Sequence, residues 1–176
     1  MAPDGYILEM PLQRLTLWIL VATAVASLSM ALGAEHLFKL EPCILCLYQR
    51  LPYVATGLLA LLALKLPTDS PAIAPIVGLC AVIYLAGAGI AVYHTGVERH
   101  WWVSGCTGAT AGEISFDQMK AALGAKPEKS CDDVNWTLFG ISMATYNAAF
   151  SFAMALASFI AARLIWKRHE PKKTSP

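Results

Sequence analysis

Four long apolar runs are the feature that most constrains how this 176-residue chain can fold. They cover residues 15–33, 46–66, 72–93 and 138–165, and the first and third contain no charged side chain. A helix of about 20 residues, rising about 1.5 Å per residue, crosses the roughly 30 Å hydrocarbon layer of a bilayer. The sequence therefore predicts an all-α integral membrane protein, a bundle of four transmembrane helices that forms one domain over residues 1–176.

Composition also indicates a membrane protein, and it argues against a protein that binds nucleic acid. The chain is 57% hydrophobic and 14% charged, which is more apolar than a water-soluble domain of this size requires. Its formal net charge of +1 comes without the clustered basic surface that binding to phosphates needs. We expect a partner in the lipid bilayer and no nucleic acid.

Positive charges near the ends of the runs predict the orientation in the membrane. Arg14 precedes the first run, and four basic residues follow the last one: Lys167, Arg168, Lys172 and Lys173. Because Lys and Arg favour the cytoplasmic side, both termini and the tail 167–176 are expected there. The loops 34–45 and 94–137 are then periplasmic, in a bacterial inner membrane. The first run exceeds the length of a signal-peptide core, so we expect it to be retained.

Four of the five cysteines fall into two pairs on the predicted outer side. Cys43 and Cys46 form a Cys-x-x-Cys motif, while Cys106 and Cys131 enclose most of the second loop. Disulfides form and persist outside the bacterial inner membrane, so oxidative thiol chemistry is expected. Cys80 lies in the middle of an apolar run, where a free cysteine packs as a small hydrophobic side chain.

The Cys-x-x-Cys motif has the surroundings of a reactive pair. Pro42 suits the first turn of a helix, so the second helix is predicted to begin at the motif. Thiolates at a helix N-terminus are stabilised by unpaired amides and by the helix dipole. Arg50 lies one turn beyond Cys46, where it can hold an anionic or carbonyl-bearing ligand instead of only reaching the interface. Pro52 predicts a kink or a break just after it.

Taken alone, Cys106 and Cys131 indicate a function less specifically than the Cys-x-x-Cys motif does. Trp101 and Trp102 are expected to anchor the start of the loop at the membrane surface. Residues 115–123 suggest a short amphipathic helix within the loop. A 24-residue separation fits a structural crosslink as well as catalysis. Beside a reactive first pair, it suits thiol–disulfide exchange, with electrons passing to Cys43 and Cys46 and then into lipid.

Several motifs together resemble one family of membrane thiol oxidases. These are Pro-Cys-x-x-Cys-x-Tyr-x-Arg at residues 42–50, Tyr-His-x-Gly-x-Glu and a Trp pair at residues 93–102, and the cysteine pair of the second outer loop. They resemble disulfide bond formation protein B, the DsbB family. The resemblance implies a quinone-dependent oxidase of a soluble, DsbA-like dithiol oxidase, using ubiquinone or menaquinone.

The resemblance also implies roles for individual residues. Cys106 would form a mixed disulfide with the partner, Cys131 would be its mate in the loop, Cys43 would exchange with that pair, and Cys46 would lie against the quinone. Arg50 matches the quinone-site arginine of the family. His94 matches a position near the quinone end of the third helix, although a polar interfacial histidine fits it equally well.

Other interpretations use the same residues differently. Four thiolates could complete a tetrahedral metal shell, although the second pair is widely spaced and an oxidising compartment competes for thiols. A membrane scaffold with two structural disulfides would give Cys43 and Arg50 no redox role. The vitamin K epoxide reductase family places its Cys-x-x-Cys in the last helix of its core, unlike this chain. A specialised paralogue with another thioredoxin-like partner stays open, and no metal, flavin or nucleotide site is expected.

Overall fold

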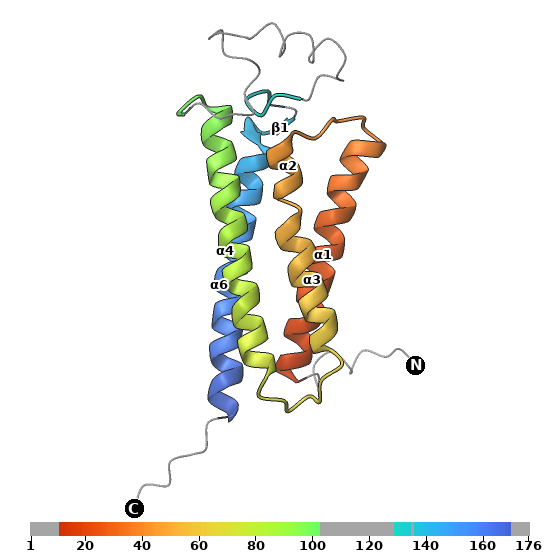
Figure 1. The fold of residues 1–176 in the computed structure, drawn as a ribbon, viewed down its shortest axis with the longest axis vertical. Coiled ribbons are helices and arrows are strands. Elements are labelled where there is room, and N and C mark those ends of the chain that lie inside the picture. The colour runs from red at the N-terminus through yellow and green to blue at the C-terminus, as the bar shows by residue number, and fades with distance from the viewer. Residues whose placement is uncertain (1–10, 103–128, 135, 170–176) are drawn as a thin grey trace, which may run out of the picture.

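Four helical spans lie side by side in the computed structural model (Figure 1), which describes residues 11–102, 129–134 and 136–169. The first span is α1 (Leu12–His36), and the second consists of α2 (Ile44–Tyr48) and α3 (Leu51–Ala63). The third is α4 (Ile73–Glu98) and the fourth is α6 (Met143–His169). All four are long and apolar enough to cross a membrane. The predicted four-helix membrane bundle is confirmed.

The bundle is built from two helix pairs with a shared core. α4 packs most extensively against α6, α1 packs against α3, and α3 joins the two pairs through α4. Leu17, Tyr84 and Ile165, from three different spans, are fully buried between the helices. Large apolar side chains cover the outside of the bundle: Trp18, Val25, Leu62, Val82 and Phe152. This distribution suits a molecule surrounded by lipid rather than by water.

The second span is broken at the predicted place. α2 ends at Tyr48, Arg50 is the N-cap of α3, and Pro52 lies in the first turn of α3. Proline fits a first turn because its missing amide hydrogen has no helical partner there. A Cβ atom at Gly87 of α4 would lie 2.8 Å from Pro52 Cγ. The missing side chain of Gly87 therefore lets α4 approach the break closely.

A short hairpin precedes the fourth span, which corrects the predicted helix start at residue 138. Strand β1 (Thr137–Leu138) pairs antiparallel with β2 (Ile141–Ser142), and α6 begins only at Met143. Phe139 and Gly140 have φ values of 52° and 77°. Two consecutive residues with positive φ form the tight turn that matches the twist of a hairpin. A helix cannot run through this turn, so the apolar run is divided.

The two ends of the bundle differ in character (Figure 1). α2, the hairpin and the end of α4 lie at one end, while the start of α1 and the end of α6 lie at the other. At the latter end, Arg14 donates hydrogen bonds to the carbonyl oxygens of Leu64 and Leu66, at 2.5 and 2.7 Å. The predicted amphipathic helix 115–123, Cys106 and the last seven residues of the tail lie outside the described residues.

Candidate functional site

The Cys-x-x-Cys motif forms the first turn of α2. Cys43 is the N-cap, with extended backbone, and only 3% of it is exposed. Its sulfur accepts a hydrogen bond from the backbone N–H of Cys46 at 3.3 Å. The two Sγ atoms lie 2.8 Å apart, and both cysteines are free. The helix therefore starts at the motif, and its unpaired N-terminal amides face the Cys43 sulfur.

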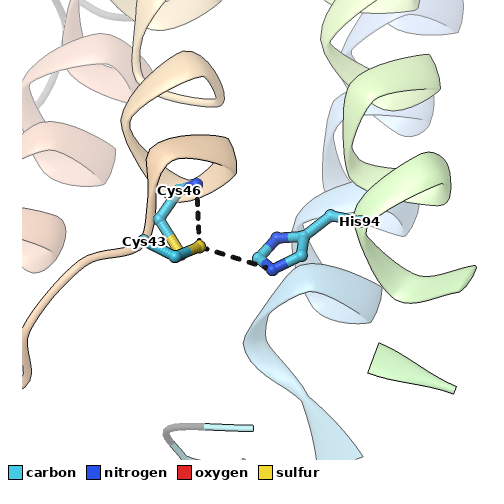
Figure 2. Close-up of side chains that lie close together, drawn as sticks. All are labelled: Cys43, Cys46 and His94. Carbon is cyan, nitrogen blue, oxygen red and sulfur yellow. Dashed lines mark hydrogen bonds between the residues drawn. The ribbon is translucent and has the colours of Figure 1, made fainter. Parts of the chain in front are cut away.

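A histidine from another span completes this group. His94 Nε2 lies 3.5 Å from Cys43 Sγ (Figure 2), and the His94 side chain is buried. His94 belongs to α4, which continues to Glu98, so it does not lie in the loop that was predicted to begin at residue 94. The extra turn of α4 is what brings the imidazole over α2.

The surroundings of Cys43 favour its thiolate. A hydrogen bond from the Cys46 thiol is the main cause, and hydrogen bonds from His94 and from the Cys46 amide add to it. Together they outweigh burial, which acts in the opposite direction, and lower the pKa of the Cys43 thiol to about 4. A low thiol pKa makes a cysteine reactive at neutral pH and a good leaving group in exchange.

This low pKa predicts an unusual pH profile for alkylation of the reduced protein. The rate at Cys43, followed by mass spectrometry of its peptide, is expected to stay nearly constant as the pH falls from about 8 to about 5. It should then drop as the pH falls through the pKa of about 4. The same cysteine in the denatured protein is the control, because its rate should fall tenfold per unit below about pH 8.5. Identical profiles for the folded and denatured forms would contradict the assignment.

Arg50 and the two thiols open onto one cavity. The cavity has a volume of about 810 Å³ and is lined by Cys43, Cys46, Arg50 and His94. Arg50 is half-buried, and its Nη1 donates a 2.8 Å hydrogen bond to Glu35 Oε2 at the end of α1. The remaining walls are mostly apolar: Ala22, Ala26, Met30, Leu138 and Phe150. The lining also includes charged side chains, among them Glu35, Glu98 and Asp133. A cavity of this size with mainly apolar walls and a cluster of polar groups is typical of a small-molecule site.

Other residues of the site were not singled out from the sequence. Glu35 pairs with Arg50, and Gln49 and Asn147 are hydrogen-bonded to each other and extend the polar group from His94. The sequence did contain one indication that Asn147 is functional, because it is a polar residue inside an apolar run. Gln49 directly precedes Arg50. No sequence pattern predicted that Arg50 contacts Glu35 of α1 or that Gln49 contacts Asn147 of α6.

The structure also brings a cysteine of the second pair to the first. Cys131 is fully buried and lies in one apolar cluster with Cys43 and Val97. The His94 imidazole is hydrogen-bonded to the backbone of Cys131. Cys131 is disulfide-bonded, and the other described cysteines, Cys43, Cys46 and Cys80, are free. Cys106 lies outside the described residues.

The geometry does not fit a metal ion as it stands. Ligand atoms of Cys43, Cys46 and His94 lie within 4.8 Å of one another, which is close enough to consider a site. Two thiolates on one tetrahedral Zn²⁺, with Zn–S bonds of about 2.3 Å, lie about 3.8 Å apart. The two sulfur atoms here are 2.8 Å apart. Cys131, being disulfide-bonded, does not supply a thiolate to the four-cysteine site considered above.

Comparison with known proteins decides the family. The family model described as disulfide bond formation protein DsbB matches residues 13–161. The chain belongs to the DsbB family. It is 31% identical to disulfide bond formation protein B of Acinetobacter baumannii over 154 residues, covering 81% of this chain and 86% of that protein.

Further relatives agree with this assignment to DsbB. The identity with disulfide bond formation protein B of Methylobacillus flagellatus is 34%, covering 65% of this chain and 71% of that protein. With the Pasteurella multocida protein of the same name it is 26%, covering 74% and 75%. No solved structure matches the chain. As a DsbB family member, the protein is a membrane thiol oxidoreductase involved in disulfide bond formation.

Proposed function

We propose that this DsbB family member is a quinone-dependent oxidase of a periplasmic, DsbA-like dithiol protein. One observation carries the proposal: Cys43, Cys46 and Arg50 line the same largely apolar cavity between the helices. The cavity volume of about 810 Å³ falls in the range of about 300 to 1,000 Å³ that is usual for small-molecule sites. Its apolar walls suit an isoprenoid quinone, and ubiquinone and menaquinone both fit this description.

Arg50 is the residue we assign to the quinone carbonyl. Its guanidinium is always charged and presents several N–H donors, of which one is used by Glu35. His94 lines the same cavity and contacts Cys43. Quinone bound there would accept two electrons and two protons and leave as quinol.

The cysteines carry the electrons in two exchanges. The partner dithiol attacks the loop disulfide at Cys106, is released with its own disulfide formed, and leaves Cys106 and Cys131 as thiols. One loop thiol then attacks Cys43 of a Cys43–Cys46 disulfide and displaces Cys46 as a thiolate. The other loop thiol breaks the resulting mixed disulfide, so that the loop disulfide is restored and two electrons reside on Cys43 and Cys46. The burial of Cys131 in one cluster with Cys43 supports direct exchange between the pairs.

The proposed orientation places this chemistry on the periplasmic face. Arg14, Lys167 and Arg168 belong to the ends of α1 and α6, and the cysteine cluster lies at the opposite end of the bundle (Figure 1). Lys and Arg flanking a span favour the cytoplasm. We therefore assign both termini to the cytoplasm and the cysteine pair at the start of α2 to the periplasmic side of the inner membrane.

Anaerobic quinone reduction by the purified protein tests the proposal. A reduced DsbA-like protein is the donor, short-chain ubiquinone and menaquinone are the acceptors, and the Cys80→Ala variant is the control because Cys80 is buried in the core away from the cavity. We expect one quinone reduced per donor dithiol oxidised, with Cys80→Ala equal to the parent protein. Absence of quinone reduction, together with zinc bound on four thiolates, would refute the proposal and favour a metal site.

A further inference from the structure

A continuous hydrogen-bonded chain of side chains, buried except for the half-buried Asn147, runs from the Cys43 sulfur into the bundle. Cys43 Sγ contacts His94 Nε2 at 3.5 Å, and His94 Nδ1 contacts Gln49 Nε2 at 2.7 Å. Gln49 Oε1 accepts from Asn147 Nδ2 at 2.5 Å, and Asn147 Oδ1 accepts from the Tyr53 hydroxyl at 2.5 Å. The chain joins the start of α2, the break before α3, α4 and α6.

The inner end of this chain sets its direction. Asn147 Oδ1 accepts hydrogen bonds from two hydroxyls, Tyr53 at 2.5 Å and Ser151 at 3.3 Å. With its oxygen turned to these donors, the Asn147 amide group must present N–H to Gln49. Gln49 consequently accepts with Oε1 and presents its own N–H to His94. An amide nitrogen only donates, so His94 Nδ1 must be the acceptor.

The outer end agrees with this direction. A neutral imidazole that accepts at Nδ1 carries its proton on Nε2, the atom that faces Cys43. A thiolate at Cys43 can only accept hydrogen bonds, and this N–H adds one to those that Cys46 supplies.

Two other groups lie near the imidazole. Glu98 Oε1 is 3.9 Å from His94 Nε2, and the other carboxylate oxygen of Glu98 accepts from Ser142. The His94 ring is also hydrogen-bonded to the backbone of Cys131, which raises the stability of a protonated ring nitrogen and so agrees with an N–H on the side away from Gln49.

We propose that Gln49 and Asn147 are positioning residues that hold His94 in the tautomer with its proton on Nε2, so that it donates to the sulfur of Cys43. The use of this arrangement rests on the proposed thiol–disulfide exchange. When a disulfide at Cys43 breaks, its sulfur leaves as a thiolate and takes both electrons of the bond. The Nε2–H group is already in place to stabilise that charge, and no proton needs to move first.

The first test uses two buried glutamines of the same chain. Gln49→Met removes the donor to His94, while Gln13→Met is the matched control, because Gln13 is equally buried near the start of α1, at the other end of the bundle. Two-bond ¹H–¹⁵N spectra of histidine-labelled, reduced protein report the tautomer, with the His94 signal assigned by its loss in His94→Gln. We expect the Nε2–H form in the parent and in Gln13→Met, and a mixture of tautomers in Gln49→Met.

The pH profile of Cys43 alkylation is the second readout. In Gln49→Met we expect its midpoint to rise by about one pH unit, so that alkylation well below the midpoint becomes about tenfold slower. A purely structural role for Gln49 would lower stability without moving either the tautomer or the midpoint. Asn147→Leu serves as a second variant if Gln49→Met does not fold, since it frees the Gln49 amide to turn and should give the same mixture.

Two results would overturn the proposal. One is a parent protein whose His94 carries its proton on Nδ1, and the other is a folded Gln49→Met protein with an unchanged tautomer and midpoint. Neither readout involves quinone. Failure of the proposed function would instead appear as absent quinone reduction with the Nε2–H tautomer intact, so the two failures are distinguishable.

Discussion

Replacing Cys46 by serine is expected to abolish quinone reduction, with a loss on the order of a thousandfold or more. Cys46 lines the cavity and lies 2.8 Å from the Cys43 sulfur, so it is the only described thiol able to close a disulfide with Cys43 inside α2. A serine hydroxyl has nearly the same shape but cannot form that disulfide. The two electrons that arrive at Cys43 would then have no route to the cavity.

The same variant should also trap an exchange intermediate. Without Cys46, Cys43 cannot resolve a mixed disulfide with the loop. Non-reducing peptide mapping is expected to find Cys43 linked to Cys131, because these two residues share one buried cluster. The control is Cys80→Ala, which removes the other free cysteine of the described chain and should keep full activity. Appreciable quinone reduction by Cys46→Ser would contradict the proposed electron path.

Replacing Arg50 by methionine is expected to raise the Michaelis constant for quinone by about 10 to 100 times, with a smaller effect on kcat. A hydrogen bond from a charged donor contributes about 1.5 to 3 kcal/mol, which corresponds to this range of affinity. Methionine keeps the length and apolar stem of the side chain but removes every donor. Steady-state assays over a range of short-chain ubiquinone concentrations measure the effect.

Two further variants sharpen the test of Arg50. Arg163→Met is the matched control, because this arginine of α6 lies over the Phe159 ring and does not line the cavity. Glu35→Gln removes the charge that holds the Arg50 guanidinium at 2.8 Å, and it is expected to leave the Michaelis constant unchanged or lower it. An unchanged constant in Arg50→Met would mean that Arg50 only anchors the helix at the interface.

Much of the fold could be predicted because the residues within a membrane span determine that it is a helix. Every backbone polar group must be satisfied within the segment itself in lipid, so a long apolar run is almost obliged to be a helix. The break just before Pro52 was also predictable, because proline disrupts the helical turn that precedes it. The hairpin before α6 was not, because Leu138, Ile141 and their neighbours continue the apolar pattern. The turn depends on the positive φ angles of Phe139 and Gly140. The hydropathy of a sequence does not report backbone angles.

The candidate site was predicted in part. The spacing of Cys43 and Cys46 and the nearby Arg50 pointed to a reactive pair and a ligand-binding arginine, since all three belong to one stretch of eight residues. The contacts of His94 depend on α4 extending past residue 93. The sequence did not predict that α4 ends at Glu98, because residues 94–98 are less apolar than the run before them. Glu35 and Asn147 reach the site from α1 and α6.

The sequence by itself determined that this chain has four membrane-span candidates, belongs to the DsbB family and begins its second span with a Cys-x-x-Cys pair. These properties follow from composition, from the period of the helix and from short motifs, all of which act over a few neighbouring residues. Only the tertiary structure decided that His94 faces Cys43, that Glu35 pairs with Arg50, and that Gln49 joins His94 to Asn147. Those contacts join residues 15 to 98 positions apart, and they depend on how four similar apolar helices rotate and pack against one another.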